Sequence, residues 1–113
     1  MAKLLHRRIA QISRKALPNE ACGFVVEGKA IPLENQADDP TGCFLISAHD
    51  YLTYRSDTIF HSHPEGVGGF SEHDRLVAAN MELTSYLYVV EADRLEILSP
   101  NGDIEIFDKV LGK

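Results

Sequence analysis

Two histidines and a carboxylate stand at a spacing that suits a metal ion. His61 and His63 end a run that begins with Asp57 and is typical of a β-strand, and Asp74 follows a few residues later. Successive side chains of a strand point to opposite faces, so His61 and His63 share one face while Ser62 points away. With Asp74 they offer three ligands to Zn²⁺ and leave a fourth position for water. This is the pattern of a catalytic zinc site, since structural sites are usually closed and rich in Cys.

Other interpretations of the same residues are structural. Paired histidines in a strand also occur as ordinary polar residues of a solvated face. Ser71 and Asp74 form a Ser-x-x-Asp step before an apolar helical run, close to a capping box, in which Ser71 accepts from free N–H groups at the helix start. Asp74 is also favourable at the positive end of the helix. The cap and the metal are compatible, because a helix start fixed by Ser71 would hold the carboxylate in one direction.

Periodicity predicts the elements that position these residues. Apolar residues at helical spacing predict a helix over residues 3–16, stopped by Pro18, and the last elements are three short strands. A strand–helix–strand order of this kind predicts an α/β fold, a mixed β-sheet sandwiched by helices. The first half of the chain predicts a strand over 22–27, a turn at Gly28-Lys29, a strand over 30–33, a loop over 35–42 and a strand over 43–46. A short helix capped by Ser47 or Asp50 and running through Tyr54 follows, and then the strand that ends at His63. The second half predicts a glycine-containing loop over 65–69, a helix from Glu72 to about Glu82, and strands over 85–90, 95–98 and 104–107, with a turn at 100–103.

Length and charge bound the kind of protein. The 113 residues predict a single domain, 1–113, and the net charge of −6 argues against a nucleic-acid partner, because no Lys/Arg-rich stripe matches phosphates. A basic cluster on the first helix, His6 to Arg8 with Arg14 and Lys15, is expected to be a solvated face. No segment has the length of a membrane span or the pattern of a secretory signal, so a cytoplasmic location is expected. Cys22 and Cys43 are expected to be buried thiols.

A zinc hydrolase also needs a general base beside the metal. The metal lowers the pKa of bound water, and a Glu close to the metal usually takes its proton. Seventeen acidic residues provide many candidates. Glu65 and Glu72 are close in sequence but lie in a loop and on the first turn of a helix. Glu20 lies at the junction of the first helix and the first strand, a rigid position, yet the residues alone do not choose it.

Two motifs together carry a resemblance to a known family. Pro18-Asn19-Glu20-Ala21-Cys22-Gly23 and His61-Ser62-His63-Pro64, followed by Ser71 and Asp74, resemble in order and spacing the signature of the JAMM (MPN-plus, Mov34/Jab) metalloproteases. The resemblance covers essentially the whole chain and implies that family's cytidine-deaminase-like fold. It implies that His61, His63 and Asp74 bind Zn²⁺, that Glu20 is the general acid/base, and that Ser71 donates a hydrogen bond to the oxyanion.

The same resemblance implies an activity and a substrate class. The expected activity is hydrolysis of an amide bond by a zinc metallopeptidase or isopeptidase, with an extended peptide or the tail of a small ubiquitin-like protein as substrate. The chain is similar to the small prokaryotic and phage branch, including the N-terminal domain of phage tail-assembly proteins. Alternatives are a non-catalytic assembly or binding module and a deaminase-like reaction, although the Pro-Cys-x-x-Cys element of deaminases is absent. A homo-oligomer through the exposed edge of the last hairpin is a further expectation.

Three other features lie outside the predicted ligand set. His73 precedes Asp74 in the predicted helix, and its side chain points about 100° away from that of Asp74 around the helix axis. We therefore expect His73 at the surface or beside the ligands. His49 is expected at a helix start. Gly66, Gly68 and Gly69 are either a simple turn or a mobile rim that lets a peptide approach the zinc.

Overall fold

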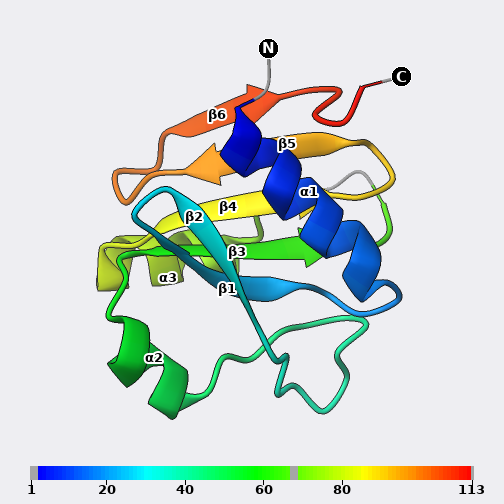
Figure 1. Ribbon diagram of the computed structural model, residues 1–113. Coiled ribbons are helices and arrows are strands. Elements are labelled where there is room, and N and C mark those ends of the chain that lie inside the picture. Colours follow the sequence, from blue (N-terminus) through cyan, green and yellow to red (C-terminus); the bar gives the residue numbers. More distant parts are fainter. Residues whose placement is uncertain (1–2, 67–68, 113) are drawn as a thin grey trace.

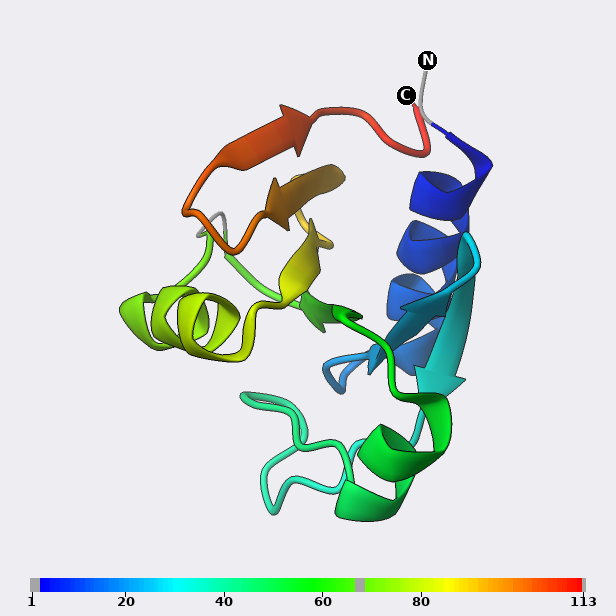
Figure 2. The ribbon, with the colours of Figure 1, turned by 90° about the vertical axis from the view of Figure 1, so that its left-hand side faces the viewer.

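The computed structural model describes residues 3–66 and 69–112. One mixed sheet lies between helices, with α1 covering one face and α3 the other (Figure 1 and Figure 2). This confirms the predicted α/β fold class. The elements are α1 Leu4–Ala16, β1 Cys22–Val26, β2 Lys29–Leu33, α2 Ala48–Tyr54, β3 Thr58–His63, α3 Glu72–Met81, β4 Thr84–Val89, β5 Arg94–Leu98 and β6 Ile104–Phe107.

Strand order places β3 in the middle of the sheet. The order is β2-β1-β3-β4-β5-β6, and β3 runs parallel to β4 and antiparallel to β1. A parallel pair needs a crossover connection, which α3 provides between β3 and β4. The carboxyl end of β3 therefore leads directly into the loop before α3. Both halves of the predicted metal site lie at this junction.

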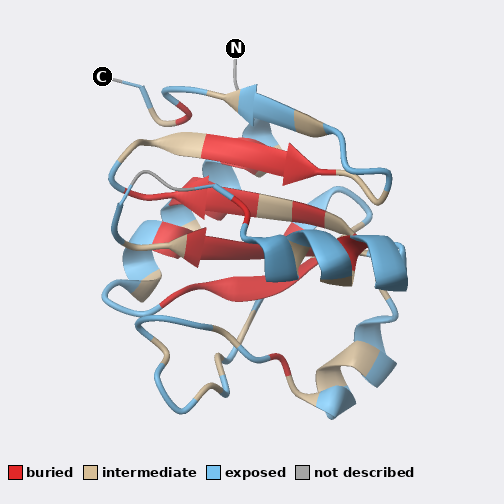
Figure 3. Cartoon of the chain, turned by 180° about the vertical axis from the view of Figure 1, so that it is seen from behind, coloured by how far each residue is buried: buried red, intermediate tan, exposed pale blue. Residues whose placement is uncertain are grey.

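The alternation of side chains along β3 and β4 divides the core between the two faces. Phe60 and Tyr88 pack with Ile9 of α1 on one face. Ile59 and Leu87, their neighbours along the strands, face the side of α3. Figure 3 shows the central strands as the most buried part of the chain, with much of α3 exposed in front of them. On this second face β3 also carries His61 and His63.

The segment 43–46 is not a strand, so that prediction was wrong. Ile46 is buried and Phe44 half-buried, but the segment pairs with no strand. Its backbone is tied to the preceding loop instead, through the hydrogen bonds from Gln36 N to Leu45 O and from Leu45 N to the Asn35 side chain. An apolar run of four residues fits an extended loop over a cavity as well as a strand.

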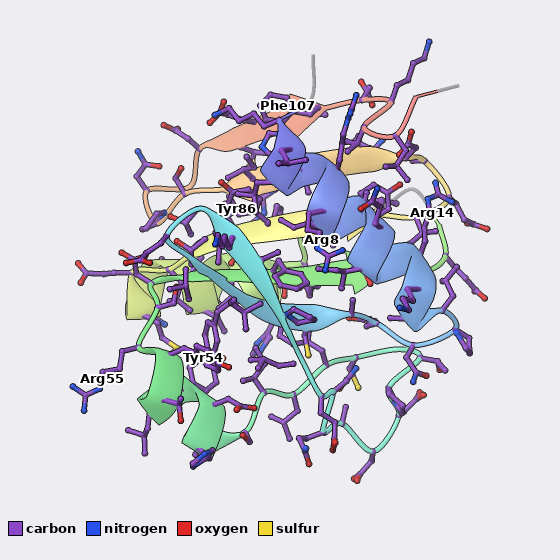
Figure 4. The ribbon with its side chains drawn as sticks, viewed as in Figure 1. Arg8, Arg14, Tyr54, Arg55, Tyr86 and Phe107 are labelled. Carbon is purple, nitrogen blue, oxygen red and sulfur yellow. The ribbon has the colours of Figure 1, made fainter. Side chains whose placement is uncertain are left out.

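Two further predictions about exposure were wrong. His6 is buried, because it follows Ile9 and Ser13 at helical spacing on the inner face of α1 and packs between Tyr86 and Phe107, both labelled in Figure 4. Cys43 is exposed, whereas Cys22 is buried as expected. The rest of the predicted basic face, including the labelled Arg8 and Arg14, is exposed.

The remaining local predictions agree closely with the structure. The first hairpin turns one residue earlier than predicted, at Glu27 and Gly28, which have φ of 50° and 77°. Two positive φ values are what a two-residue hairpin of this twist requires. Ser47, one of the two predicted caps, accepts from Asp50 N at the start of α2. No helix within the described ranges is long and apolar enough to cross a membrane.

Candidate metal centre

The fold brings His61, His63 and Asp74 together. One ligand atom from each lies within 4.8 Å of the others. The two imidazole rings, at the end of β3, have centroids 5.3 Å apart, and His61 Nε2 lies 3.9 Å from Asp74 Oδ2. These distances leave room for one ion between the three groups. The side chains belong to a central strand and a helix start, which are among the more rigid positions that a fold offers.

The helix start fixes the direction of the Asp74 carboxylate. Ser71 Oγ accepts from Asp74 N at 3.1 Å, and Asp74 Oδ2 accepts from Ser71 N at 3.0 Å. This is the reciprocal capping box that the Ser-x-x-Asp step predicted. The same oxygen of Asp74 also faces His61, so the carboxylate can cap the helix and at the same time point toward the two histidines. The Ser71 hydroxyl keeps its proton for another acceptor, because it acts only as an acceptor within the cap.

Burial keeps His61 neutral, as a metal ligand must be. The ring is 2% exposed, and Phe44 stacks on it with centroids 4.6 Å apart and planes 20° apart. Burial lowers the pKa of His61 to about 4, with nearby Asp74 acting in the opposite direction and His63 in the same one. His61 Nδ1 is buried and has no hydrogen-bond partner among the described residues. Phe44 is a contact that the sequence analysis did not find, since it comes from the segment wrongly predicted as a strand.

Glu20 enters the site through the pairing of β1 with β3. Cys22 lies opposite His61 in the register, and the hydrogen bond from Ser62 N to Ala21 O continues this pairing toward Glu20. The Glu20 backbone is held on both sides, donating to Pro40 O and accepting from the Asn35 amide. Continued by one more residue, the register places Glu20 opposite His63. The position is set by strand pairing rather than by closeness along the chain.

The Glu20 carboxyl is buried without a hydrogen-bond partner from any residue the structure describes. It is 6% exposed. Burial, followed by the negative charges of Asp74 and Asp39, raises the pKa of Glu20 to about 7. A carboxyl whose pKa lies near neutrality is suited to take up and release a proton. The rival candidates Glu65 and Glu72 are both exposed.

One cleft connects these groups. It has a volume of about 530 Å³ and is walled by the 42–46 segment with α2 on one side and by α3 on the other. Glu20, His61, His63, Ser71 and Asp74 all line it, together with His73, which is exposed and stands outside the group of three ligands. His49 is exposed in α2. Gly68 lies outside the described residues, so the choice between the two interpretations of the three glycines stays a prediction.

The donor set fits zinc. Two imidazoles and one carboxylate, with no fourth protein ligand among the residues that the structure describes, match open zinc sites, and iron(II) is also bound by two His and one carboxylate. The orphaned Nδ1 of His61 is one difference from most zinc-binding histidines, whose second nitrogen usually donates to a partner. The arrangement therefore defines an α/β domain in which two His and one Asp could hold a metal ion, with a buried Glu lining the same cleft.

Comparison with known proteins agrees with this class. The chain belongs to the family described as prokaryotic homologs of the JAB domain, whose profile matches residues 2–99. The solution structure of protein DSY2949 from Desulfitobacterium hafniense is similar in fold, with a TM-score of 0.66 and 21% identity over 95% of this chain and 88% of that one. No curated protein matches the chain. The family and fold implied by the sequence motifs are thereby confirmed.

Proposed function

We propose that the protein is a zinc-dependent hydrolase of amide bonds, a metallopeptidase or isopeptidase. The observation that carries this proposal is the meeting of Glu20, a buried carboxyl with a pKa of about 7, with the His61–His63–Asp74 group in one cleft. Membership in the JAB family supports it. Zinc bound by the three ligands would activate a water molecule and polarise the scissile carbonyl.

The residues around the ligands have separate tasks in this proposal. Glu20 accepts the proton of the nucleophilic water and delivers it to the leaving nitrogen, which its near-neutral pKa allows in both directions. Ser71 donates a hydrogen bond from its hydroxyl to the developing oxyanion, because the cap uses only a lone pair of its oxygen. Phe44 covers His61 and shields that side of the site from water.

The substrate that suits the cleft is an extended chain. The walls are formed by one loop with a short helix and by one longer helix, and the cleft is partly open to solvent rather than enclosed. A peptide or the flexible tail of a small ubiquitin-like protein can enter such a cleft in extended form. A role in phage tail assembly is a narrower form of the same proposal and rests only on the resemblance of motifs.

Metal analysis and one matched pair of variants test the proposal. Purified protein should contain, or take up, one zinc per chain, and Asp74→Ala should abolish this uptake. Glu20→Gln should keep zinc but lose at least about 100-fold in hydrolysis of a peptide library, since a general base contributes about 10²–10⁴-fold. Glu65→Gln, which removes an exposed carboxylate from the neighbouring loop, should keep both.

Two outcomes would reject the proposal in different ways. Protein that neither contains nor binds zinc would favour a non-catalytic binding module, the alternative that the fold also permits. Iron in place of zinc, with no hydrolysis, would favour redox chemistry by the two-His, one-carboxylate group.

A further inference from the structure

The cleft extends beyond the metal ligands into an arm with a different character. The arm is lined by Ile46 and Tyr51 on one side, Val77 of α3 on the other, and Ile59 and Ser85 on its floor. Its walls are apolar apart from two hydroxyl groups. No charged side chain lines this part of the cleft among the described residues, since Glu20, Asp74 and the histidines stand at the metal end. The arm therefore selects for uncharged groups.

Strand register gives the position of Ser85 relative to the metal end. Ser85 lies opposite Ile59, and Leu87 lies opposite His61, on the parallel strands β4 and β3. Two residues along a strand span about 6.6 Å, and residues two apart share a face. Ser85 therefore lies on β4, the neighbour of the strand that carries His61, and is displaced from His61 along the strand direction by about the length of one side chain. A side chain next to the scissile bond can reach that far.

The Ser85 hydroxyl differs from the other buried serines. Ser13 Oγ donates to Ile9 O at 2.7 Å, and Ser62 Oγ accepts from Ala21 N at 2.8 Å. Ser85 is 4% exposed, yet its hydroxyl makes no hydrogen bond to any residue within the described ranges. Its residual exposure is to the cleft that it lines.

The hydroxyl reaches the cleft, where water can satisfy it, and an apolar group that displaced this water would leave it unpaired at a cost of about 1–3 kcal/mol. A site that keeps a polar group of this kind discriminates between ligands that satisfy it and ligands of equal size that do not. The hydroxyl therefore points to the polar atom of an incoming side chain.

We propose that Ser85 is a specificity-determining residue: the arm binds an uncharged substrate side chain next to the scissile amide and selects one that carries a hydroxyl or amide over its apolar isostere. This inference rests on the proposed function, since it names the substrate side chain of that same site. Tyr51, across the arm, contributes its ring as an apolar wall, held edge-on against Phe24 with centroids 5.2 Å apart.

Binding of small zinc-directed probes tests the proposal without requiring turnover. The probes are hydroxamates bearing one amino-acid side chain next to the zinc-binding group, made in two series with that side chain on the acyl or the amino side. Each series contains three pairs of similar size, Thr/Val, Gln/Met and Tyr/Phe. Dissociation constants are measured by calorimetry on the zinc-loaded protein. At least one polar member should bind about 10-fold more tightly than its apolar partner, and Ser85→Ala should remove this preference.

Controls separate this effect from general damage. Ser13→Ala removes a buried hydroxyl on the opposite face of the sheet and should leave the 10-fold preference intact. Zinc content and unfolding temperature should be the same in Ser85→Ala and the parent protein, so that the changed preference cannot come from a lost fold.

Three results would overturn the inference. It is wrong if no pair is discriminated, if the preference survives Ser85→Ala, or if none of the probes binds zinc-loaded protein at millimolar concentration. Failure of the proposed function would give a different result. The protein would discriminate the probes through Ser85 but hydrolyse no peptide, so the arm would still be a binding site while the peptidase activity would be rejected.

Discussion

Replacing Glu20 by Gln should stabilise the metal-free protein, and the gain should grow as the pH rises. The parent protein buries a carboxyl that accepts no hydrogen bond from the described residues and whose pKa is raised to about 7 from its ordinary value of 4.5. Gln has nearly the same shape and no charge. The substitution therefore removes the cost of ionising a buried group without opening a cavity.

The sign and size of this effect follow from the two pKa values. A carboxyl whose pKa is higher in the folded state than in the unfolded state favours folding below pH 4.5, and this contribution is lost as the pH rises through 7. A tenfold change in proton affinity corresponds to about 1.4 kcal/mol, so the full loss is about 3 kcal/mol. Between pH 5 and pH 8 we expect the free energy of unfolding of Glu20→Gln to gain about 2–3 kcal/mol relative to the parent.

Urea unfolding of both proteins after removal of metal by a chelator measures this difference. His61, whose pKa is lowered to about 4, titrates in both proteins, so its contribution cancels in the comparison. Glu65→Gln is the control and should show the same stability as the parent at every pH, because it removes a carboxylate that is already exposed. A difference between Glu20→Gln and the parent that does not change from pH 5 to pH 8 would refute the reasoning.

Substitutions at three further positions test other parts of the structure. Gly23→Ala should lower the free energy of unfolding by more than about 3 kcal/mol, because its Cβ would lie 2.0 Å from Ile31 O; a loss below 1 kcal/mol would show that the strands can separate there. Ser71→Ala should cost about 1 kcal/mol by loss of the cap, measured by thermal unfolding, and Ser71→Thr should recover most of it. Burial, followed by the positive charge of Lys3, lowers the pKa of His6 in the folded state. As the pH falls below 6.5, the unfolded state therefore binds a proton at His6 more readily than the folded state does, and the free energy of unfolding decreases. His6→Leu should therefore lose less stability than the parent between pH 7.5 and pH 5, and equal losses would count against the buried position.

The parts of the site that sequence could predict are the parts that depend on short-range geometry. The alternation of a strand places His61 and His63 on one face, and a Ser-x-x-Asp step specifies a capped helix that presents Asp74. Both patterns extend over only a few residues. They were confirmed because nothing distant in the chain can change which face a residue two positions away occupies.

Long-range pairing explains what the residues alone could not choose. Glu20 reaches the site only because β1 pairs with β3 in one particular register, and the motif resemblance supplied what local geometry could not. The errors have the same origin. Apolar residues 43–46 predicted a strand, but the segment pairs with no strand of the sheet and lines the cleft, where Phe44 stacks on His61. His6 looked solvated beside Arg7 until the packing of β6 over the start of α1 placed Phe107 against it.

In the proposed site, the metal end is rigid, whereas one wall of the arm can be changed by substitution. The metal-facing groups belong to a central strand and a reciprocally hydrogen-bonded helix start, so their geometry is fixed before any ligand arrives. Ile46 of the arm wall, in contrast, belongs to the 43–46 segment, which pairs with no strand and is tied to the preceding loop by hydrogen bonds. Substitutions in that wall can change which side chain fits without moving His61 or Asp74. In the proposed site Ser85 lies on the floor of the arm and faces this wall, and from there its hydroxyl would influence selectivity while His61 and Asp74 keep their positions.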